Sequence, residues 1–322
     1  MMIRLLLAGL LISRLACPQE VKIPAGYKRD ARLSADLRQI VAQLGLDRDF
    51  DAGEDGLEQI SLAVIVIGAG KPRLGSVNMD NFIYPASVYK MYVAAEVLHQ
   101  VSQNQLSLTD KVIVRSPNDV DKSKEIESDP RPLLRDGDTV TVNYLLDLMI
   151  TRSDNSAANC LIDIAQRENI NALMHAYNWH GSEVTRKFLS RKYEDPGYEK
   201  IRGTETCALH AADFLYRVYT RQLVNPWVSM QLQALLARQL DKSKLAAGLP
   251  SNAMFYHKTG WFAYWTHDVG IVDDGHTRYV IACFLPLEER LALPKYQALS
   301  AQVFHLVRQR TQQSQSPKKR LF

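Results

Sequence analysis

The chain has 322 residues, of which 46% are hydrophobic and 23% are charged, with a formal net charge of +4. These values are typical of a soluble globular protein and leave room for one large domain or two ordinary ones. The positive excess is small and no basic helix is interleaved with aromatic residues, which argues against a nucleic-acid partner.

The N-terminus carries a segment typical of export. Arg4 precedes an apolar run from Leu5 to Ile12, and small or turn-prone residues follow near Cys17. This pattern predicts a secretory signal over residues 1–17, too short to span a bilayer permanently, and hence a periplasmic or secreted protein. Two alternatives stay open: an uncleaved apolar segment, and a lipid anchor at Cys17. Arg14 fits poorly both with a cleaved secretory signal and with a lipoprotein signal. No other segment is apolar enough to span a membrane.

The cysteines do not form a framework. The chain has four of them, Cys17, Cys160, Cys207 and Cys283. Cys17 is expected to leave with the signal or to be lipidated, and three remaining thiols are too few for a disulfide scaffold. We expect buried thiols, with one pair as the alternative. None has metal-ligand spacing, so no metal or other cofactor is expected.

The first part of the chain predicts one helix and two strands. A helix is expected over 34–44, with Ser34 as its cap and an apolar stripe along one face. Residues 50–58 are acidic and contain glycine, which indicates a loop. A buried strand follows over 61–67, and a second strand is expected over 73–77.

The middle of the chain is mostly helical. Residues 106–138 and 181–206 are polar or highly charged and are predicted as loops. Helices are expected over 86–101, 142–151, 155–167, 171–177, 207–222 and 226–240.

The last third of the chain turns to strands, predicted over 254–259, 268–272 and 279–285, with Asp274-Gly275 as a hairpin signal. A final helix is expected over 295–310, followed by a basic polar tail, 311–322, that is predicted to be disordered from Gln312. Strands near both termini and helices between them predict an α+β fold with one sheet built from both chain ends.

One candidate site is the pair Ser87 and Lys90, at the start of the helix predicted over 86–101. Positions i and i+3 share a helix face, so the ammonium group can reach the hydroxyl. A serine at a helix N-terminus also lies beside unpaired N–H groups, which suits a developing oxyanion. The pattern is weak alone, because Ser316 and Lys319 repeat it in the tail, and Ser87 can equally be an ordinary first-turn serine.

Two further motifs strengthen this hypothesis. Ser153-Asp154-Asn155 lies between two predicted helices, and Lys258-Thr259-Gly260 lies on a predicted strand. With Ser87 and Lys90 they form, in this order, the motif set of class A β-lactamases and penicillin-binding proteins. The chain therefore resembles the class A β-lactamase-like serine hydrolases, within the β-lactamase and penicillin-binding D,D-peptidase superfamily.

The resemblance runs from about residue 30 to 310 and includes Tyr84, residues 247–250 and residues 267–272. It implies a β-lactamase-like catalytic domain over 21–310. One half, 21–85 with 207–310, would hold an antiparallel sheet flanked by helices. The other half, 86–206, would be all-helical and would include the loop 181–206. The active site would lie between the halves.

The chemistry of acyl transfer assigns the first two roles, in which Ser87 Oγ attacks the carbonyl and a partly desolvated Lys90 serves as base. The remaining roles are implied by the resemblance. The backbone N–H groups of Ser87 and Trp261 would form the oxyanion hole, and Ser153 would relay a proton to the leaving nitrogen. Asn155 would bind the amide of the substrate side chain. Lys258 and Thr259 would bind the substrate carboxylate, and Gly260 would leave room for the substrate along the strand. Asp154 is expected to be structural.

The chain departs from the family pattern at the hydrolytic step. Glu194 is the best candidate for the carboxylate that activates the deacylating water, but the Leu-Asn expected after it is replaced by Gly197-Tyr198. Glu194 can equally be an ordinary loop carboxylate. Trp261 is larger than the residue expected after Lys-Thr-Gly, which predicts a reshaped cleft and a substrate other than a typical penicillin.

The sequence thus predicts a monomeric serine hydrolase that opens β-lactam or related amide bonds through a Ser87 acyl-enzyme, an activity that would confer β-lactam resistance. Two alternatives are a D,D-peptidase-like hydrolase of cell-wall peptides and a penicillin-binding sensor domain that is acylated without turnover. His-Glu-x-x-His and Gly-x-Ser-x-Gly are both absent, which argues against a zinc hydrolase and against a triad that uses His267.

Overall fold

The computed structural model describes residues 21–53, 56–194 and 201–315. The predicted signal, Cys17, Gly197-Tyr198 and the end of the tail lie outside these residues. Within them, no helix is both long enough and apolar enough to cross a membrane.

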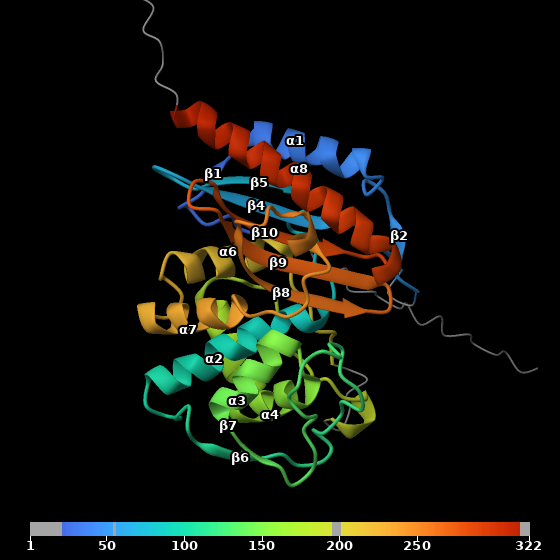
Figure 1. The fold of residues 1–322 in the computed structure, drawn as a ribbon, viewed down its shortest axis with the longest axis vertical. Coiled ribbons are helices and arrows are strands. Elements are labelled where there is room, and N and C mark those ends of the chain that lie inside the picture. Colours follow the sequence, from blue (N-terminus) through green and yellow to red (C-terminus); the bar gives the residue numbers. More distant parts are fainter. Residues whose placement is uncertain (1–20, 54–55, 195–200, 316–322) are drawn as a thin grey trace, which may run out of the picture.

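A six-stranded sheet forms the upper half of the molecule, with strand order β1-β5-β4-β10-β9-β8 (Figure 1). The strands are β1 (Lys28–Arg29), β4 (Ser61–Ile67), β5 (Arg73–Val77), β8 (Met254–Phe262), β9 (Trp265–Asp273) and β10 (Arg278–Leu285). The prediction of one sheet built from both chain ends is confirmed. All neighbouring strands are antiparallel except β1 and β5, which are parallel. The sequence did not predict β1, because two exposed residues give no periodic signal.

Both faces of the sheet are buried. On β4, Leu62 and Val64 face the core layer shared with α1 and α8, whereas Ala63 and Ile65 face the layer shared with the helical half. Successive side chains of a strand point to opposite faces, so a strand covered on both sides reads as a continuous apolar run. Helices α1 (Ala31–Gln43) and α8 (Glu289–Gln315) cover the outer face, and α6 (Ala208–Tyr219) packs against the inner one (Figure 1).

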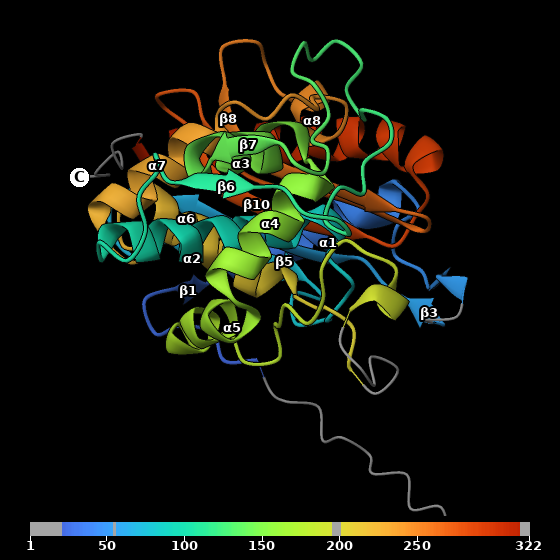
Figure 2. The ribbon, with the colours of Figure 1, turned by 90° about the horizontal axis from the view of Figure 1, so that it is seen from below.

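The helical half is organised around α2 (Lys90–Ser102), which is buried from Lys90 to Leu98. It packs against α4 (Asn155–Ala165), α5 (Arg167–Ala176) and α7 (Pro226–Leu236). Figure 2 shows these helices from below, with the sheet behind them. Helix α3 (Val142–Asp147) continues into a π-helix, Leu148–Arg152. The predicted α+β fold class is confirmed, while the division of the chain at residues 85 and 207 stays a prediction.

Among the described residues, the shorter elements include two small hairpins and three 3-10 helices. The hairpins pair β2 (Phe50–Asp51) with β3 (Leu57–Glu58), and β6 (Lys111–Ile113) with β7 (Thr139–Thr141). The 3-10 helices are Ala86–Tyr89, Arg191–Tyr193 and Leu245–Gly248. The prediction of an uninterrupted loop over 50–58 was therefore wrong, because two-residue strands leave no alternation to read.

Several predicted helix boundaries were wrong, among them those of α1, α5 and α8. Helix α1 is capped by Asp30, whose carboxylate accepts a hydrogen bond from the Leu33 N–H at 2.9 Å, and not by Ser34. Helix α5 begins at Arg167, directly after Gln166 breaks the path of α4 with a positive φ of 65°. Helix α8 runs from Glu289 to Gln315, so residues 312–315 are helical and not disordered. Its C-terminal turns are polar, which is why the sequence pattern ended the helix early.

Cys160, Cys207 and Cys283 are buried free thiols. The expectation of buried thiols is confirmed for these three residues, and the alternative of a disulfide between two of them is wrong.

Candidate active site

Ser87 lies in a strained turn between the sheet and α2. It belongs to the 3-10 helix Ala86–Tyr89, which leads directly into α2 at Lys90. Ala86 has a φ of 46°, a left-handed conformation that side-chain-bearing residues rarely adopt and that often marks functional turns. Ser87 is buried, and its hydroxyl has no hydrogen-bond partner among the described residues. The Lys90 ammonium group, which the helix spacing allows to reach this hydroxyl, instead donates to Ser153 and Asn155.

The sheet holds this turn from two sides. On β8, a Cβ at Gly260 would lie 2.9 Å from the backbone nitrogen of Ser87, so glycine allows β8 to pack against the turn. On β9, the buried His267 donates from Nε2 to the Tyr84 carbonyl at 2.8 Å and accepts at Nδ1 from the Leu285 N–H at 3.2 Å. Burial lowers the pKa of His267 to about 4, so it is a neutral packing residue.

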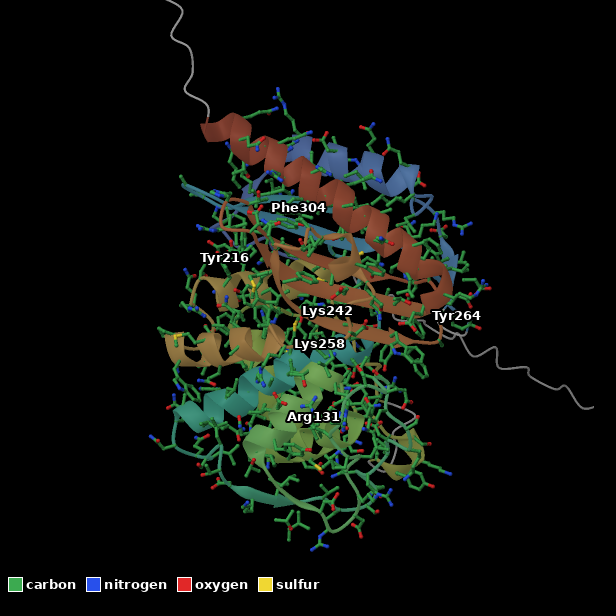
Figure 3. The ribbon with its side chains drawn as sticks, viewed as in Figure 1. Arg131, Tyr216, Lys242, Lys258, Tyr264 and Phe304 are labelled. Carbon is green, nitrogen blue, oxygen red and sulfur yellow. The ribbon has the colours of Figure 1, made fainter. Side chains whose placement is uncertain are left out.

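The three predicted motifs meet at Ser153. Its Oγ accepts hydrogen bonds from Lys258 Nζ at 2.9 Å and from Lys90 Nζ at 3.2 Å. Lys90 also donates to the Ser153 carbonyl and, at 2.7 Å, to Asn155 Oδ1. Ser153 adopts a left-handed conformation, φ 66°, at the end of the π-helix. Figure 3 shows Lys258 where the sheet meets the helical half.

The two lysines are fully buried and close to each other. Burial lowers the pKa of Lys90 to about 8, although the charges of Glu125, Asp121 and Asp154 oppose part of this effect. Burial and the positive charge of Lys90 together lower the pKa of Lys258 well below its ordinary value. Two cations that share one acceptor favour a state in which only one is protonated, so a neutral amine is available beside Ser153.

Asp121 is a site residue that the sequence did not reveal. Its carboxylate accepts from the Asn155 backbone N–H at 2.7 Å and from Asn155 Nδ2 at 2.9 Å. These bonds fix the amide so that Oδ1 faces Lys90. Burial raises the pKa of Asp121. Several acidic residues lie in the loop 106–138, and no local pattern distinguishes Asp121 from the others.

Asp154 is structural, as predicted. It caps α4 by accepting from the Ala157 N–H at 2.7 Å, and its other oxygen pairs with Arg152 at 2.7 Å inside the protein. Capping residues of this type stabilise a helix start by about 1 kcal/mol.

Glu194 lies outside the hydrogen-bonded cluster of Lys90, Ser153 and Lys258. Its Oε2 accepts from the Lys187 backbone N–H at 3.2 Å and lies 3.5 Å from the guanidinium of Arg167. The neighbour of Lys90 in this loop is instead Phe188, whose ring centroid lies 4.2 Å from Lys90 Nζ. The sequence did not reveal Phe188, since one aromatic residue in a charged loop carries no local signal.

Phe188 is held in place by stacking. Its ring lies parallel to that of Tyr89, with 4.6 Å between centroids, and the Phe188 backbone N–H donates to Asn159 Oδ1 at 2.8 Å. An apolar ring therefore covers one side of the Lys90 ammonium group.

The β8–β9 hairpin carries the other predicted residues. Thr259 is buried, whereas Trp261 is 45% exposed and is followed by the exposed Phe262 and Tyr264. The oxyanion role of the Trp261 N–H and the carboxylate-binding role of Thr259 stay predictions. Within the described residues, no group of three or more His, Cys, Asp or Glu side chains is arranged to hold a metal ion.

Comparisons with known proteins show the family and the fold of the chain. A family model described as the beta-lactamase enzyme family matches residues 51–303. The solved structure of PBP-A is similar with a TM-score of 0.71 and 18% identity, over 87% of this chain and 97% of that one. A beta-lactamase from Sphaerobacter thermophilus gives a TM-score of 0.71 and 18% identity, over 85% and 97%. An ancestral class A beta-lactamase gives a TM-score of 0.67 and 21% identity, over 85% of this chain and 99% of that one. No curated protein matches.

Proposed function

Since the chain belongs to the β-lactamase enzyme family, we propose that it is a serine hydrolase that opens β-lactam or related amide bonds through an acyl-enzyme on Ser87. The observation that carries this proposal is the position of Ser153 Oγ between the amines of Lys90 and Lys258. This arrangement supplies a base and a proton relay at the start of α2, next to the turn that presents Ser87.

Acylation would use the neutral form of Lys90, whose population rises as the pH approaches the Lys90 pKa of about 8. Lys90 takes the proton of Ser87 Oγ, directly or through water, as the oxygen forms a bond to the substrate carbonyl. The N–H groups of Ser87 and Trp261 would stabilise the oxyanion. When the C–N bond breaks, Ser153 gives its proton to the leaving nitrogen and is reprotonated by Lys258 or Lys90.

The substrate contacts follow from which donors remain available. Asn155 Nδ2 has two hydrogens and gives one to Asp121, which leaves one for an amide carbonyl of the substrate. Lys258 and Thr259 would bind its carboxylate, and the substrate backbone would lie along β8 past Gly260.

A second function is a D,D-peptidase-like hydrolase or a penicillin-binding sensor with slow deacylation. The observation that favours it is Phe188, which lies against Lys90 while the Glu194 carboxylate is engaged by the Lys187 N–H and by Arg167. A hydrolytic water needs a base next to the acyl bond, and an apolar ring cannot supply one. One of the similar solved structures is a mutant of PBP-A as an acyl-enzyme complex with penicillin G.

The test is intact-protein mass spectrometry over time after mixing with penicillin G or a reactive cephalosporin. A transient adduct that decays as product accumulates supports the β-lactamase. A lasting adduct supports the peptidase or the sensor. Absence of any adduct, or an equal adduct in Ser87→Ala, would refute Ser87 as the nucleophile for these substrates.

Glu194→Gln separates the two functions further. If Glu194 activates the deacylating water, this variant accumulates the acyl-enzyme. If Glu194 only holds the loop through Lys187 and Arg167, the lifetime of the adduct stays within about twofold of the parent value, because the oxygen of the glutamine amide can still accept the hydrogen bond from the Lys187 N–H.

We also propose that the protein is exported and acts as a monomer. N-terminal sequencing of the protein recovered from its native host would distinguish cleavage near residue 17 from lipidation at Cys17. Light scattering of the purified chain would test the oligomeric state.

A further inference from the structure

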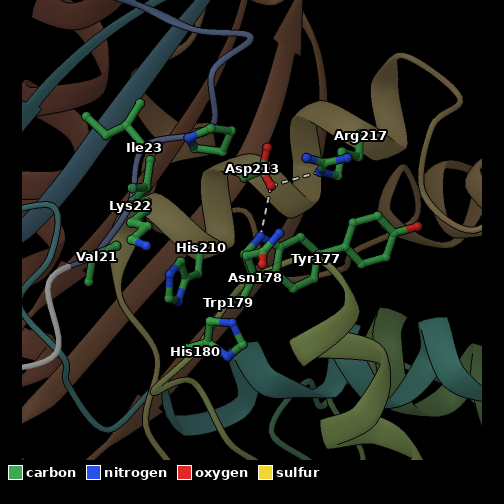
Figure 4. Close-up of a pocket in the computed structure, with 12 residues that line it drawn as sticks. Val21, Lys22, Ile23, Tyr177, Asn178, Trp179, His180, His210, Asp213 and Arg217 are labelled. Carbon is green, nitrogen blue, oxygen red and sulfur yellow. Dashed lines mark hydrogen bonds and ion pairs between the residues drawn. The ribbon is translucent and has the colours of Figure 1, made fainter.

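A cavity of about 540 Å³ lies between residues 21–24, residues 177–180 and helix α6 (Figure 4). We call it the α6 cavity. None of its lining residues belongs to the cluster of Ser87, Lys90, Ser153 and Lys258. Its volume is in the range of small-molecule binding sites.

A chain of hydroxyl groups determines the tautomer of one lining residue, His210. The Tyr92 hydroxyl lies 3.0 Å from Thr206 Oγ1, which lies 2.9 Å from Ser182 Oγ. Ser182 Oγ lies 2.7 Å from His210 Nδ1. Tyr92 is buried, and Thr206 is the partner of its hydroxyl among the described residues, so Tyr92 must donate to Thr206 to avoid an unpaired buried O–H group. Thr206 then donates to Ser182, and Ser182 donates to His210 Nδ1.

His210 therefore carries its hydrogen on Nε2. The side chain is only 3% exposed, and Nε2 has no hydrogen-bond partner among the described residues. Nε2 keeps some accessible surface, and because His210 lines the cavity, we take this surface to face the cavity. Burial lowers the pKa of His210 to about 3, so at neutral pH the ring is an uncharged donor directed at the cavity. A ligand with a hydrogen-bond acceptor would satisfy it.

The charges around the cavity favour an anionic acceptor. The Asp213 carboxylate accepts from Tyr27, from Trp179 Nε1 at 2.8 Å and from Arg217 Nε at 2.8 Å, so its negative charge is already compensated. Lys22 also lines the cavity and has no carboxylate partner among the described residues. In Figure 4, Lys22 and His210 lie on one side of the cavity and Asp213 and Arg217 on the other.

The walls favour an apolar ligand body. Val21, Ile23 and Pro24 contribute aliphatic lining, and Tyr177 contributes an aromatic ring. The ring of Tyr177 is stacked on Trp179, with 4.9 Å between centroids, and Arg217 lies over it at 4.9 Å, so the shape of the ligand body is not fixed by ring stacking. Aromatic and aliphatic walls with a few convergent polar groups are typical of small-molecule sites.

We propose that the α6 cavity binds a small organic carboxylate with an apolar body. The carboxylate accepts a hydrogen bond from His210 Nε2 and lies near Lys22, and the body packs against Ile23 and Tyr177. This site is separate from the acylation site and does not depend on the proposed function.

The test is calorimetric titration of the full chain with 2-naphthoate, compared with the uncharged 2-naphthamide. We expect one site per chain, with the amide about tenfold weaker, because a carboxylate accepts a stronger, charge-assisted hydrogen bond than an amide does. His210→Phe should weaken 2-naphthoate binding at least about tenfold, and Lys22→Met about fivefold, through loss of the donor and of a nearby cation.

Two control variants should leave binding unchanged. Lys28→Met removes an exposed cation from β1 outside the cavity, and Trp261→Ala changes the surface beside Ser87. If His210→Phe does not fold, the Nε2 resonance of His210 in ¹⁵N-histidine-labelled protein replaces it and should shift on addition of 2-naphthoate. The proposal is overturned if 2-naphthoate does not bind, if Lys22→Met and His210→Phe bind as the parent does, if the Nε2 resonance does not move, or if Trp261→Ala abolishes binding.

Discussion

The ring of Phe188 lies 4.2 Å from the Lys90 ammonium group, in the loop where a deacylating carboxylate was expected. The proposed base of acylation thus has an apolar neighbour on this side, while Ser153 and Asn155 hold it on the other. Under the proposed function, this relationship separates the two half-reactions. The groups assigned to acylation meet at Ser153, whereas no ion pair joins a carboxylate to Lys90 among the described residues, although the charges of Glu125 and Asp121 act on it.

Replacing Phe188 should therefore act on deacylation. Phe188→Glu puts a carboxylate beside Lys90, and we expect the acyl-enzyme with penicillin G to decay at least about tenfold faster, since a positioned base contributes roughly 10²–10⁴-fold. Phe188→Gln is the matched control, with similar size and no charge. The lifetime of the adduct is measured by mass spectrometry. Equal lifetimes for the two variants would contradict the idea that deacylation is slow because no carboxylate lies at this position.

The rate of acylation should depend on the protonation of Lys90. The base is the neutral amine, and burial lowers the pKa of Lys90 to about 8. The rate constant should therefore rise about tenfold per pH unit below pH 8 and level off above it. Stopped-flow acylation with a chromogenic cephalosporin between pH 5 and 10 measures this profile. A flat profile, or a rate that falls as the pH rises through 8, would argue against Lys90 as the base.

Asp121→Asn should slow acylation and shift this profile. Loss of the carboxylate frees the Asn155 amide to rotate, and we expect about a tenfold slower rate, corresponding to one hydrogen bond of about 1.4 kcal/mol. The Asp121 charge raises the pKa of Lys90, so its removal should move the midpoint to lower pH. Glu127→Gln, an exposed change in the same loop, is the control. If both the midpoint of the pH profile and the acylation rate were unchanged, Asp121 would have no role in the site.

Gly260→Ala should destabilise the contact between β8 and the Ser87 turn. The new Cβ would lie 2.9 Å from both the Ser87 nitrogen and the Pro85 carbonyl oxygen, and overpacking of this kind costs about 1–3 kcal/mol. Urea unfolding measures the loss, and acylation should slow in parallel as the turn shifts. At Gly68, a Cβ would meet nothing within 4 Å, so Gly68→Ala should leave both quantities near the parent values. Equal stability of the two variants would show that β8 does not constrain the turn.

Patterns within short stretches of sequence determined much of this protein. Continuous apolar runs predicted β4, β9 and β10, and the spacing of Ser87, Lys90, Ser153 and Lys258 predicted a site that the fold brings together at Ser153. These signals are local, because strand periodicity and motif spacing are properties of neighbouring residues.

Only the tertiary structure decided what surrounds Lys90. Asp121, Asn155 and Phe188 come from different segments, and which acid or aromatic residue of a charged loop reaches the lysine depends on the path of that loop over the folded core. The same holds for His210, whose tautomer follows from Tyr92, Thr206 and Ser182 on three separate segments. Hydrogen bonds between distant residues form only once packing has set their distances, so the sequence determined which groups are present and the fold determined which of them meet.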